Sequence, residues 1–336
     1  MNEIRWNPLV KWWIIVAEHR SVRPWRPEEK EVEFKCPFCP GAPELVHLDR
    51  WDVVSLPNKY PALSSTPLEV HRESFEPYRV REAKGSCRVI IETPEHEGDL
   101  YTLTLEHATR VMEVFREEYL KLSQLDYVEY VAIFRNKGKE IGVSLTHPHS
   151  QIYALPFTPL RILVEIGSMR EYQSRYEKCL LCDIVKYELS RSIRVIYENR
   201  DYIALLPYYA MWPYEIHVYP KKHLNSLGDL DHEGLKYLAD ALRVITALYT
   251  ELLERDAPYI MVFHNPPTRG DHSYYHFHVE FYQPYRDKEK LKYAAGIEWG
   301  FWVFTYDGSP EKKVLELKNA CEKVENKLRG VLGECK

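Results

Sequence analysis

The segment THPHSQIYA (146–154) holds two histidines two residues apart, followed two residues later by a glutamine. The residues after the second histidine are typical of a β-strand, whose side chains alternate between two faces with a period of two. His147, His149 and Gln151 should therefore project to the same side. Imidazole nitrogens bind metal ions, transfer protons near neutral pH and attack phosphorus as nucleophiles. This segment is the first candidate for chemistry.

Two C-x-x-C pairs supply metal-binding partners for the histidines. Each pair is followed by two strand-like segments, by a histidine at the end of the second one, and later by an H-x-H. Aligning the two stretches gives two candidate Cys₂His₂ sets: Cys36, Cys39, His96 and His147; and Cys179, Cys182, His223 and His276. Zinc favours four nitrogen or sulfur ligands, and a site without an open position is structural. We therefore predict one or two structural zinc ions per chain.

If His147 binds the metal, His149 is the histidine available for the chemical step. A neutral imidazole attacks phosphorus well, and one ring nitrogen can attack while a backbone carbonyl holds the other. Gln151 faces the same side and can donate an amide N–H to a phosphoryl oxygen. An isolated H-x-H is more often a packed polar pair, but the adjacent metal ligands favour a catalytic role for His149 and Gln151.

Length, charge and cysteine content narrow the class of protein. The chain has 336 residues, of which 45% are hydrophobic and 28% charged, and its formal net charge is −5. This balance is that of a globular protein and gives no support for a nucleic-acid partner. No run approaches the roughly 18 apolar residues of a membrane helix, and the N-terminus lacks the pattern of a signal peptide. We expect a cytoplasmic protein in which four of the seven cysteines, those of the two C-x-x-C pairs, form metal or redox sites rather than disulfides, with metal binding favoured by the nearby histidines.

The elements that must position these residues occur twice. In the first stretch we predict strands at 51–63 and 87–96, a helix near 105–122, and strands at 129–138 and 150–157. In the second stretch we predict strands at 201–210 and 214–223, a helix over 235–252, and strands at 258–267 and 274–284. A period near 130 residues indicates a duplicated domain rather than a solenoid. The expected fold class is α+β, with two antiparallel-sheet units that each pack a helix on one face.

The duplication gives the domain boundaries. We expect an N-terminal half over 1–157 and a C-terminal half over 158–336. The second half should begin with charged helices at 158–190 that link the two units. It should end in a terminal helix, with Ser309 as the N-cap and Pro310 in the first helical position.

Five blocks, in this order, resemble the galactose-1-phosphate uridylyltransferases of the histidine-triad superfamily: RWNPLVKWWIIVAEHRSVRPW, CPFCPG, FRNKGKEIGVSLTHPHSQIYA, LPYYAMWPYEIHVYPKKH and HFHVEFYQP. The resemblance covers about residues 4–300 and implies duplicated histidine-triad-like units. It implies that His149 takes UMP from UDP-glucose, releases glucose 1-phosphate, and then passes UMP to galactose 1-phosphate. In the family this is a ping-pong reaction of galactose metabolism. Gln151 matches the residue that hydrogen-bonds the phosphoryl group.

The resemblance also implies substrate-binding residues. Two arginines, Arg20 and Arg23, match residues that contact substrate phosphates, for which bidentate geometry suits them. Residues at positions lining the nucleotide and phosphate pocket are Asn58, Asn136, Gly138 and Ser144. At the sugar end, Lys292 and Glu298 match residues that meet the hexose phosphate and the sugar hydroxyls. Family members are typically homodimers, so we expect a homodimer that binds a nucleotide sugar and a hexose 1-phosphate.

The second metal differs among family members. Some use a carboxylate with three histidines, and the matching residues are Glu165, His264, His276 and His278. This set would suit iron as well as zinc, and it competes with the cysteine set for His276. Thiolates are the stronger zinc ligands in a closed tetrahedral site, so we favour the cysteine set. Glu165, His264 and His278 would then stay as polar lining near the pocket.

Other functions share the same motifs. Ile297 stands where many family members have tyrosine, and FWVFTYD lacks an expected glutamine, so the accepted sugar stays open. An ADP-glucose or dinucleoside-polyphosphate phosphorylase would use the same histidine to form an adenylyl intermediate. A zinc-stabilised nucleotide-binding module without turnover is the alternative outside enzymes. Against that alternative, a binding module needs neither the nucleophile His149 nor Gln151.

Overall fold

One antiparallel sheet runs through the molecule. The computed structural model describes residues 2–22, 36–70, 75–143 and 145–336. Within these residues ten strands form the sheet, in the order β13-β8-β9-β10-β12-β11-β6-β7-β5-β3. The first half contributes β3 (Val54–Pro57), β5 (Ser86–Ile91), β6 (Tyr130–Lys137) and β7 (His149–Leu155). The second half contributes β8 (Val195–Glu198), β9 (Tyr202–Leu205), β10 (Ile216–Pro220), β11 (Tyr259–His264), β12 (His278–Tyr282) and β13 (Glu334–Cys335).

The strand order displays the duplication. β3, β5, β7 and β6 lie side by side in the first half, as β9, β10, β12 and β11 do in the second. The halves meet where β6 pairs with β11, with Asn136 opposite Ile260. The predicted α+β class with antiparallel sheets is confirmed, and the structure adds that the two sheets are continuous. As a result His149 and His278 occupy equivalent positions, each at the start of its strand.

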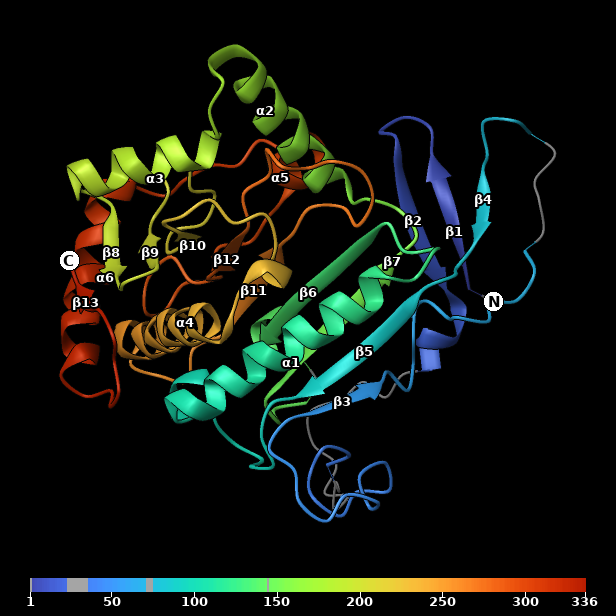
Figure 1. The fold of residues 1–336 in the computed structure, drawn as a ribbon, viewed down its shortest axis with the longest axis horizontal. Coiled ribbons are helices and arrows are strands. Elements are labelled where there is room, and N and C mark those ends of the chain that lie inside the picture. The colour runs from blue at the N-terminus through green and yellow to red at the C-terminus, as the bar shows by residue number, and fades with distance from the viewer. Residues whose placement is uncertain (1, 23–35, 71–74, 144) are drawn as a thin grey trace.

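Helices cover both faces of the sheet. α1 (Leu105–Ser123) and α4 (His232–Leu253) lie side by side across one face, and α6 (Pro310–Glu325) packs beside α4 (Figure 1). Their apolar stripes bury Phe115 and Leu242 together with Ile152 and Phe263 of the sheet. On the other face, α2 (Leu160–Tyr176) and α3 (Leu180–Arg191) bury residues such as Ile166 against the sheet. Each such side chain contributes about 1.5–3 kcal/mol to stability.

The alternation of β7 separates its chemical face from its core face. Ser150, Ile152 and Ala154 are buried, with Ile152 and Ala154 in the same core as α1 and α4, whereas His149 and Gln151 are only half-buried. The predicted alternation of side chains between the two faces, with a period of two residues, is therefore confirmed for this strand.

The boundaries of several elements differ from the predictions. The strands predicted over 51–63 and 87–96 are shorter, and the region 158–190 forms two helices, because Glu177 ends α2 with a φ of 54°. α6 begins at Pro310 after Ser309, as predicted. A separate small sheet, not predicted, joins β1 (Asn2–Asn7), β2 (Trp12–Ala17) and β4 (Val80–Glu82). The remaining helical elements are α5 (Gly296–Phe301), η1 (Glu18–Val22), η2 (Leu100–Thr102), η3 (Lys139–Ile141) and η4 (Leu227–Asp229).

A disulfide that the odd cysteine count did not suggest fastens the C-terminal strand. Cys321 of α6 is bonded to Cys335 of β13, and β13 pairs with β8 at the edge of the sheet opposite β3 (Figure 1). The backbone N–H of Leu332 donates to the buried carboxylate of Asp240, which holds the same segment. The bridge and this hydrogen bond keep the edge of β8 covered.

Replacing Cys335 with serine should lower the free energy of unfolding by about 3 kcal/mol, because opening a loop of 14 residues returns chain entropy to the unfolded state. Urea unfolding without reductant measures the change. Wild-type protein in a phosphine reductant should show the same loss, and the variant should not respond to the reductant. Equal midpoints for wild type and variant would contradict the prediction.

Candidate active site and metal centres

The first cysteine pair and its two predicted histidines form one cluster. Ligand atoms of Cys36, Cys39, His96 and His147 all lie within 4.8 Å of one another. Nδ1 of the fully buried His147 is 3.7 Å from Sγ of Cys36 and 3.6 Å from Sγ of Cys39, and Nδ1 of His96 is 3.3 Å from Sγ of Cys39. Burial lowers the pKa of His147, which favours the neutral imidazole that ligates metals.

The second cysteine pair forms an equivalent cluster. Cys179 is the N-cap of α3 and Cys182 lies in its first turn, while His223 follows β10 and His276 precedes β12. Nδ1 of His276 is 3.5 and 3.4 Å from the two sulfur atoms, and Nδ1 of His223 is 3.5 Å from Sγ of Cys182. A hydrogen bond from the Cys182 thiol lowers the pKa of Cys179 to about 3 and raises the pKa of Cys182. One thiolate is thus already favoured before a metal binds.

Both clusters fit a tetrahedral zinc ion. Zinc–sulfur and zinc–nitrogen bonds of about 2.3 and 2.05 Å at a tetrahedral angle separate sulfur from nitrogen by about 3.6 Å, close to the distances above. Nε2 of three ligand histidines faces a backbone carbonyl, namely His147 with Thr93 at 2.9 Å, His276 with Pro220 at 3.1 Å and His223 with Ser273 at 2.9 Å. A carbonyl can only accept a hydrogen bond, so the proton stays on Nε2 and Nδ1 keeps its lone pair for the metal.

His149 lies beside the first cluster and is oriented by it. Its Nδ1 lies 2.8 Å from the carbonyl oxygen of His147, which can only accept, so Nδ1 carries the proton and Nε2 carries the lone pair. The ring of Phe38, from the cysteine loop, packs 5.2 Å from the His149 ring. Gln151 lies two residues further along the same face of β7. The arrangement places an imidazole with its lone pair on Nε2 and an amide side chain on the same face of β7.

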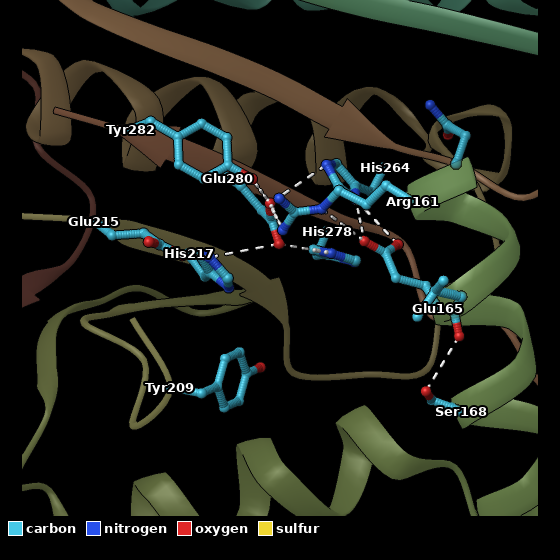
Figure 2. A network of polar contacts seen from close by, with 12 residues as sticks. Arg161, Glu165, Ser168, Tyr209, Glu215, His217, His264, His278, Glu280 and Tyr282 are labelled. Atoms are coloured by element: carbon cyan, nitrogen blue, oxygen red, sulfur yellow. Dashed lines mark hydrogen bonds and ion pairs between the residues drawn. The ribbon is translucent and has the colours of Figure 1, made fainter. Parts of the chain in front are cut away.

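A third cluster is buried in the second half of the chain (Figure 2). Its ligand atoms, which lie within 4.8 Å of one another, belong to Glu165 of α2, His264 of β11, and His278 and Glu280 of β12. Nδ1 of His264 is 2.9 Å from the carboxylate of Glu165. Burial opposes ionisation of Glu165, but the charge of His264 lowers the pKa of this carboxyl to about 2. Conversely, despite burial, Glu165 and Glu280 raise the pKa of His264.

Arg161 enters this cluster from α2. Its guanidinium donates to Glu280 at 2.6 Å and to Glu165 at 3.2 Å (Figure 2). Both carboxylates are therefore already neutralised by protein cations. The structure also separates the two ligand sets that share His276 in the sequence, because the ring of His276 faces the cysteines and Glu280 takes the fourth position beside Glu165, His264 and His278.

The third cluster occupies the position in the second half that His149 and Gln151 have in the first. His278 directs its Nδ1 to the carbonyl oxygen of His276 at 3.1 Å, as His149 does to His147. Glu280, however, stands two residues after His278, where the first half has Gln151. This carboxylate binds Arg161, whereas an amide side chain stands at the matching position of the first half. The second half thus keeps the scaffold of the first with a different side chain beside the histidine.

The predicted nucleotide-pocket residues come from different elements of the first half. Asn58 follows β3, Asn136 lies on β6, and Arg20 is in η1. Gly138 has a φ of 101°, and a Cβ there would lie 2.3 Å from Cβ of Pro258, so only glycine fits. Arg23 and Ser144 lie outside the residues that the structure describes.

Lys292 and Glu298 hold the chain around α5. The ammonium group of Lys292 donates to the carbonyl oxygens of Met211, at 2.7 Å, and Thr305. The buried Glu298 accepts from the N–H of Ala295 at 3.1 Å and from the hydroxyl of Thr305 at 3.0 Å. Within this chain both side chains are engaged in local structure.

Sequence reasoning missed part of the third cluster. Glu280 had a detectable signal, because comparing the two repeats at the position of Gln151 leads directly to it. Arg161 and the buried His217, whose Nε2 lies 3.4 Å from Glu280, gave no signal, since their contacts depend on how α2 and β10 pack (Figure 2).

The fold and the site together define a duplicated α+β protein with a Cys₂His₂ cluster in each half and, beside the first, a histidine whose Nδ1 is held by a backbone carbonyl. Comparison with known proteins specifies the family. Residues 1–159 match the galactose-1-phosphate uridyl transferase N-terminal domain, and residues 165–302 match the C-terminal domain of the same family. The chain belongs to the galactose-1-phosphate uridylyltransferase family.

Individual relatives are similar in sequence to this chain over most of their own length. The galactose-1-phosphate uridylyltransferase of Thermotoga maritima is 39% identical over 320 residues, which cover 95% of this chain and 98% of the relative. That of Haemophilus influenzae is 33% identical over 307 residues, covering 88% and 87%. A solved uridylyltransferase structure superposes with a TM-score of 0.88 at 42% identity, covering 96% of this chain and 99% of the other. An ADP-glucose phosphorylase from Arabidopsis thaliana, solved with bound ADP-glucose, shares the fold with a TM-score of 0.71 at 24% identity, covering 95% and 99%.

Cys36→Ser and Cys179→Ser should each remove one zinc ion per chain, because each variant deletes one of four ligands in a different cluster. Glu165→Gln is the matched control and should leave the zinc content unchanged, since the third cluster is neutralised by Arg161. Elemental analysis of protein purified without chelators gives the stoichiometry. Unchanged zinc in either cysteine variant, or loss of zinc in Glu165→Gln, would contradict this assignment.

Proposed function

We propose that this chain transfers UMP from UDP-glucose to galactose 1-phosphate through a uridylyl-histidine at His149, producing glucose 1-phosphate and UDP-galactose. The observation that carries the proposal is the contact between Nδ1 of His149 and the carbonyl oxygen of His147, which leaves the lone pair on Nε2, on the same face of β7 as Gln151. Membership of the family, with relatives named for this reaction, supports the same substrates.

In the first step Nε2 of His149 attacks the α-phosphorus of UDP-glucose. A P–N bond forms, the bond from the α-phosphorus to the bridging oxygen breaks, and glucose 1-phosphate leaves as a stable anion. Because this leaving group needs no proton, a glutamine suffices where a hydrolase would need an acid. Gln151 donates an N–H to a phosphoryl oxygen and stabilises charge that develops there. An oxygen of the phosphate of galactose 1-phosphate then attacks the phosphorus and restores His149.

The remaining substrate contacts follow from the family motifs. Phosphate groups of the nucleotide sugar and the hexose 1-phosphate would bind the guanidinium groups of Arg20 and Arg23. The residues proposed around the nucleotide are Asn58, Asn136, Gly138 and Ser144, and those proposed for the hexose are Lys292 and Glu298.

Zinc is the metal we propose for both Cys₂His₂ clusters. When bound, it supplies a structural cross-link rather than a catalytic group, because four protein ligands close its coordination. Iron is the alternative metal in the second half, where two imidazoles and two carboxylates of the third cluster offer suitable donors. Iron binding would require Arg161 to release Glu280.

We also propose that the active form is a cytoplasmic homodimer whose halves, 1–157 and 158–336, carry the nucleophile and the second metal respectively. A group of exposed aromatic side chains around α5, including Trp299, Phe301 and Trp302, offers an apolar contact surface of the kind that subunit interfaces bury. Among the described residues, no helix has both the length and the apolar character needed to cross a bilayer.

His149→Ala should abolish the covalent adduct and reduce turnover by at least 10³-fold, as expected when a nucleophile is lost. His278→Ala is the matched control from the second half and should still form the adduct. Intact-mass measurement after mixing with UDP-glucose should show one added UMP, which galactose 1-phosphate discharges. An adduct in His149→Ala would contradict the proposal, and an AMP adduct formed from ADP-glucose but no UMP adduct would favour the phosphorylase alternative.

A further inference from the structure

The strand that carries His149 is held from behind by a buried acid. Ser150, between His149 and Gln151, points into the core and is 1% exposed. Its hydroxyl donates to the carboxylate of Glu92 at 2.5 Å, and Glu92 itself is fully buried. Hydrogen bonds of this kind, from a neutral donor to a buried charged acceptor, are short and strong.

Glu92 contacts both neighbours of His149. Its backbone N–H donates to the carbonyl oxygen of Pro148 at 3.1 Å, while its side chain binds Ser150. Residue 92 follows β5, which pairs with β7 through Ile91 opposite His149. The backbone on either side of the nucleophile is therefore fixed to one residue of the adjacent chain segment.

A balanced charge network keeps Glu92 in place. The guanidinium of Arg135, which is 2% exposed, donates to both carboxylate oxygens of Glu92 at 3.0 Å and to Asp99 at 2.8 Å. Asp99 also accepts from Lys137 at 2.6 Å and from the hydroxyl of Tyr259 at 2.5 Å. Two acids and two bases thus compensate one another, as buried charges require.

The second half lacks this arrangement at the equivalent position. Val279 follows His278 where Ser150 follows His149, and a valine has no hydroxyl to donate. The contact thus occurs in the half whose histidine has Gln151 as its neighbour, and not in the half where Glu280 replaces it. This distribution links the contact to the chemistry rather than to the fold, which both halves share.

We propose that Glu92 is a positioning residue for the nucleophile, acting through the hydroxyl of Ser150 and the carbonyl of Pro148 to hold His149 at the attacking distance. This inference rests on the proposed function of His149. Misplacement of a reacting group by about 1 Å can cost 10²-fold in rate. A side chain that never touches substrate would therefore affect the transfer step while leaving nucleotide binding unchanged.

Ser150→Ala tests the proposal, because it removes the hydroxyl but leaves the Glu92–Arg135 pair intact. We expect the single-turnover rate of His149 uridylylation by UDP-glucose to fall at least tenfold, with the Kd for UMP within twofold of wild type. Ser150→Thr keeps a hydroxyl and should react within threefold of the wild-type rate. Thr246→Ala is the matched control, since it deletes a fully buried hydroxyl in α4 that donates to the carbonyl of Arg243.

The outcomes are distinct. A wild-type rate in Ser150→Ala, or an equal loss in Ser150→Thr, overturns the positioning role of this contact. If wild-type protein forms no UMP adduct, the proposed function fails instead. In that case hydrogen–deuterium exchange of the segment 146–154 tests whether the contact between Ser150 and Glu92 holds this segment in place. Faster exchange in Ser150→Ala but not in Thr246→Ala supports this role of the contact, and unchanged exchange in Ser150→Ala overturns it.

Discussion

The hydrogen bond from Nδ1 of His149 to the carbonyl oxygen of His147 is the interaction on which the site depends. It determines which nitrogen of His149 keeps its lone pair and in which direction the ring faces. The ring of His147 lies in the first Cys₂His₂ cluster, with its own Nε2 directed to Thr93. Under the proposed function, a metal in that cluster would act on catalysis indirectly, by fixing the carbonyl that orients His149.

The duplicated fold places two equivalent histidines in different surroundings. Both halves offer a histidine at the start of a strand, oriented by the carbonyl two residues earlier. Beside His149 the neighbour on the same face is the neutral Gln151, whereas beside His278 it is the carboxylate of Glu280. The second carboxylate draws in Arg161 and becomes part of a closed ion-pair network. A change of charge at one position therefore distinguishes the proposed reactive site from the ion-pair network of the second half.

Much of the fold and of the candidate site could be predicted from sequence, because the signals are local or repeated. Alternation defined the faces of β7, helical spacing located α1 and α4, and the repeated order of cysteines and histidines anticipated which side chains meet in two clusters. The pairing of β6 with β11, the Cys321–Cys335 bridge and the contact of Ser150 with Glu92 were not predictable in this way. Each depends on segments that are distant in the chain and brought together by packing, with no periodic pattern to reveal it.

The most direct test of the central claim is the position of the phosphoryl group on His149. Protein labelled with ¹⁵N-histidine would be mixed with UDP-glucose, and phosphorus–nitrogen coupling in the trapped adduct would be measured by NMR. The hydrogen bond to the His147 carbonyl predicts attachment at Nε2 alone. Attachment at Nδ1, or at a histidine other than His149, would contradict the account.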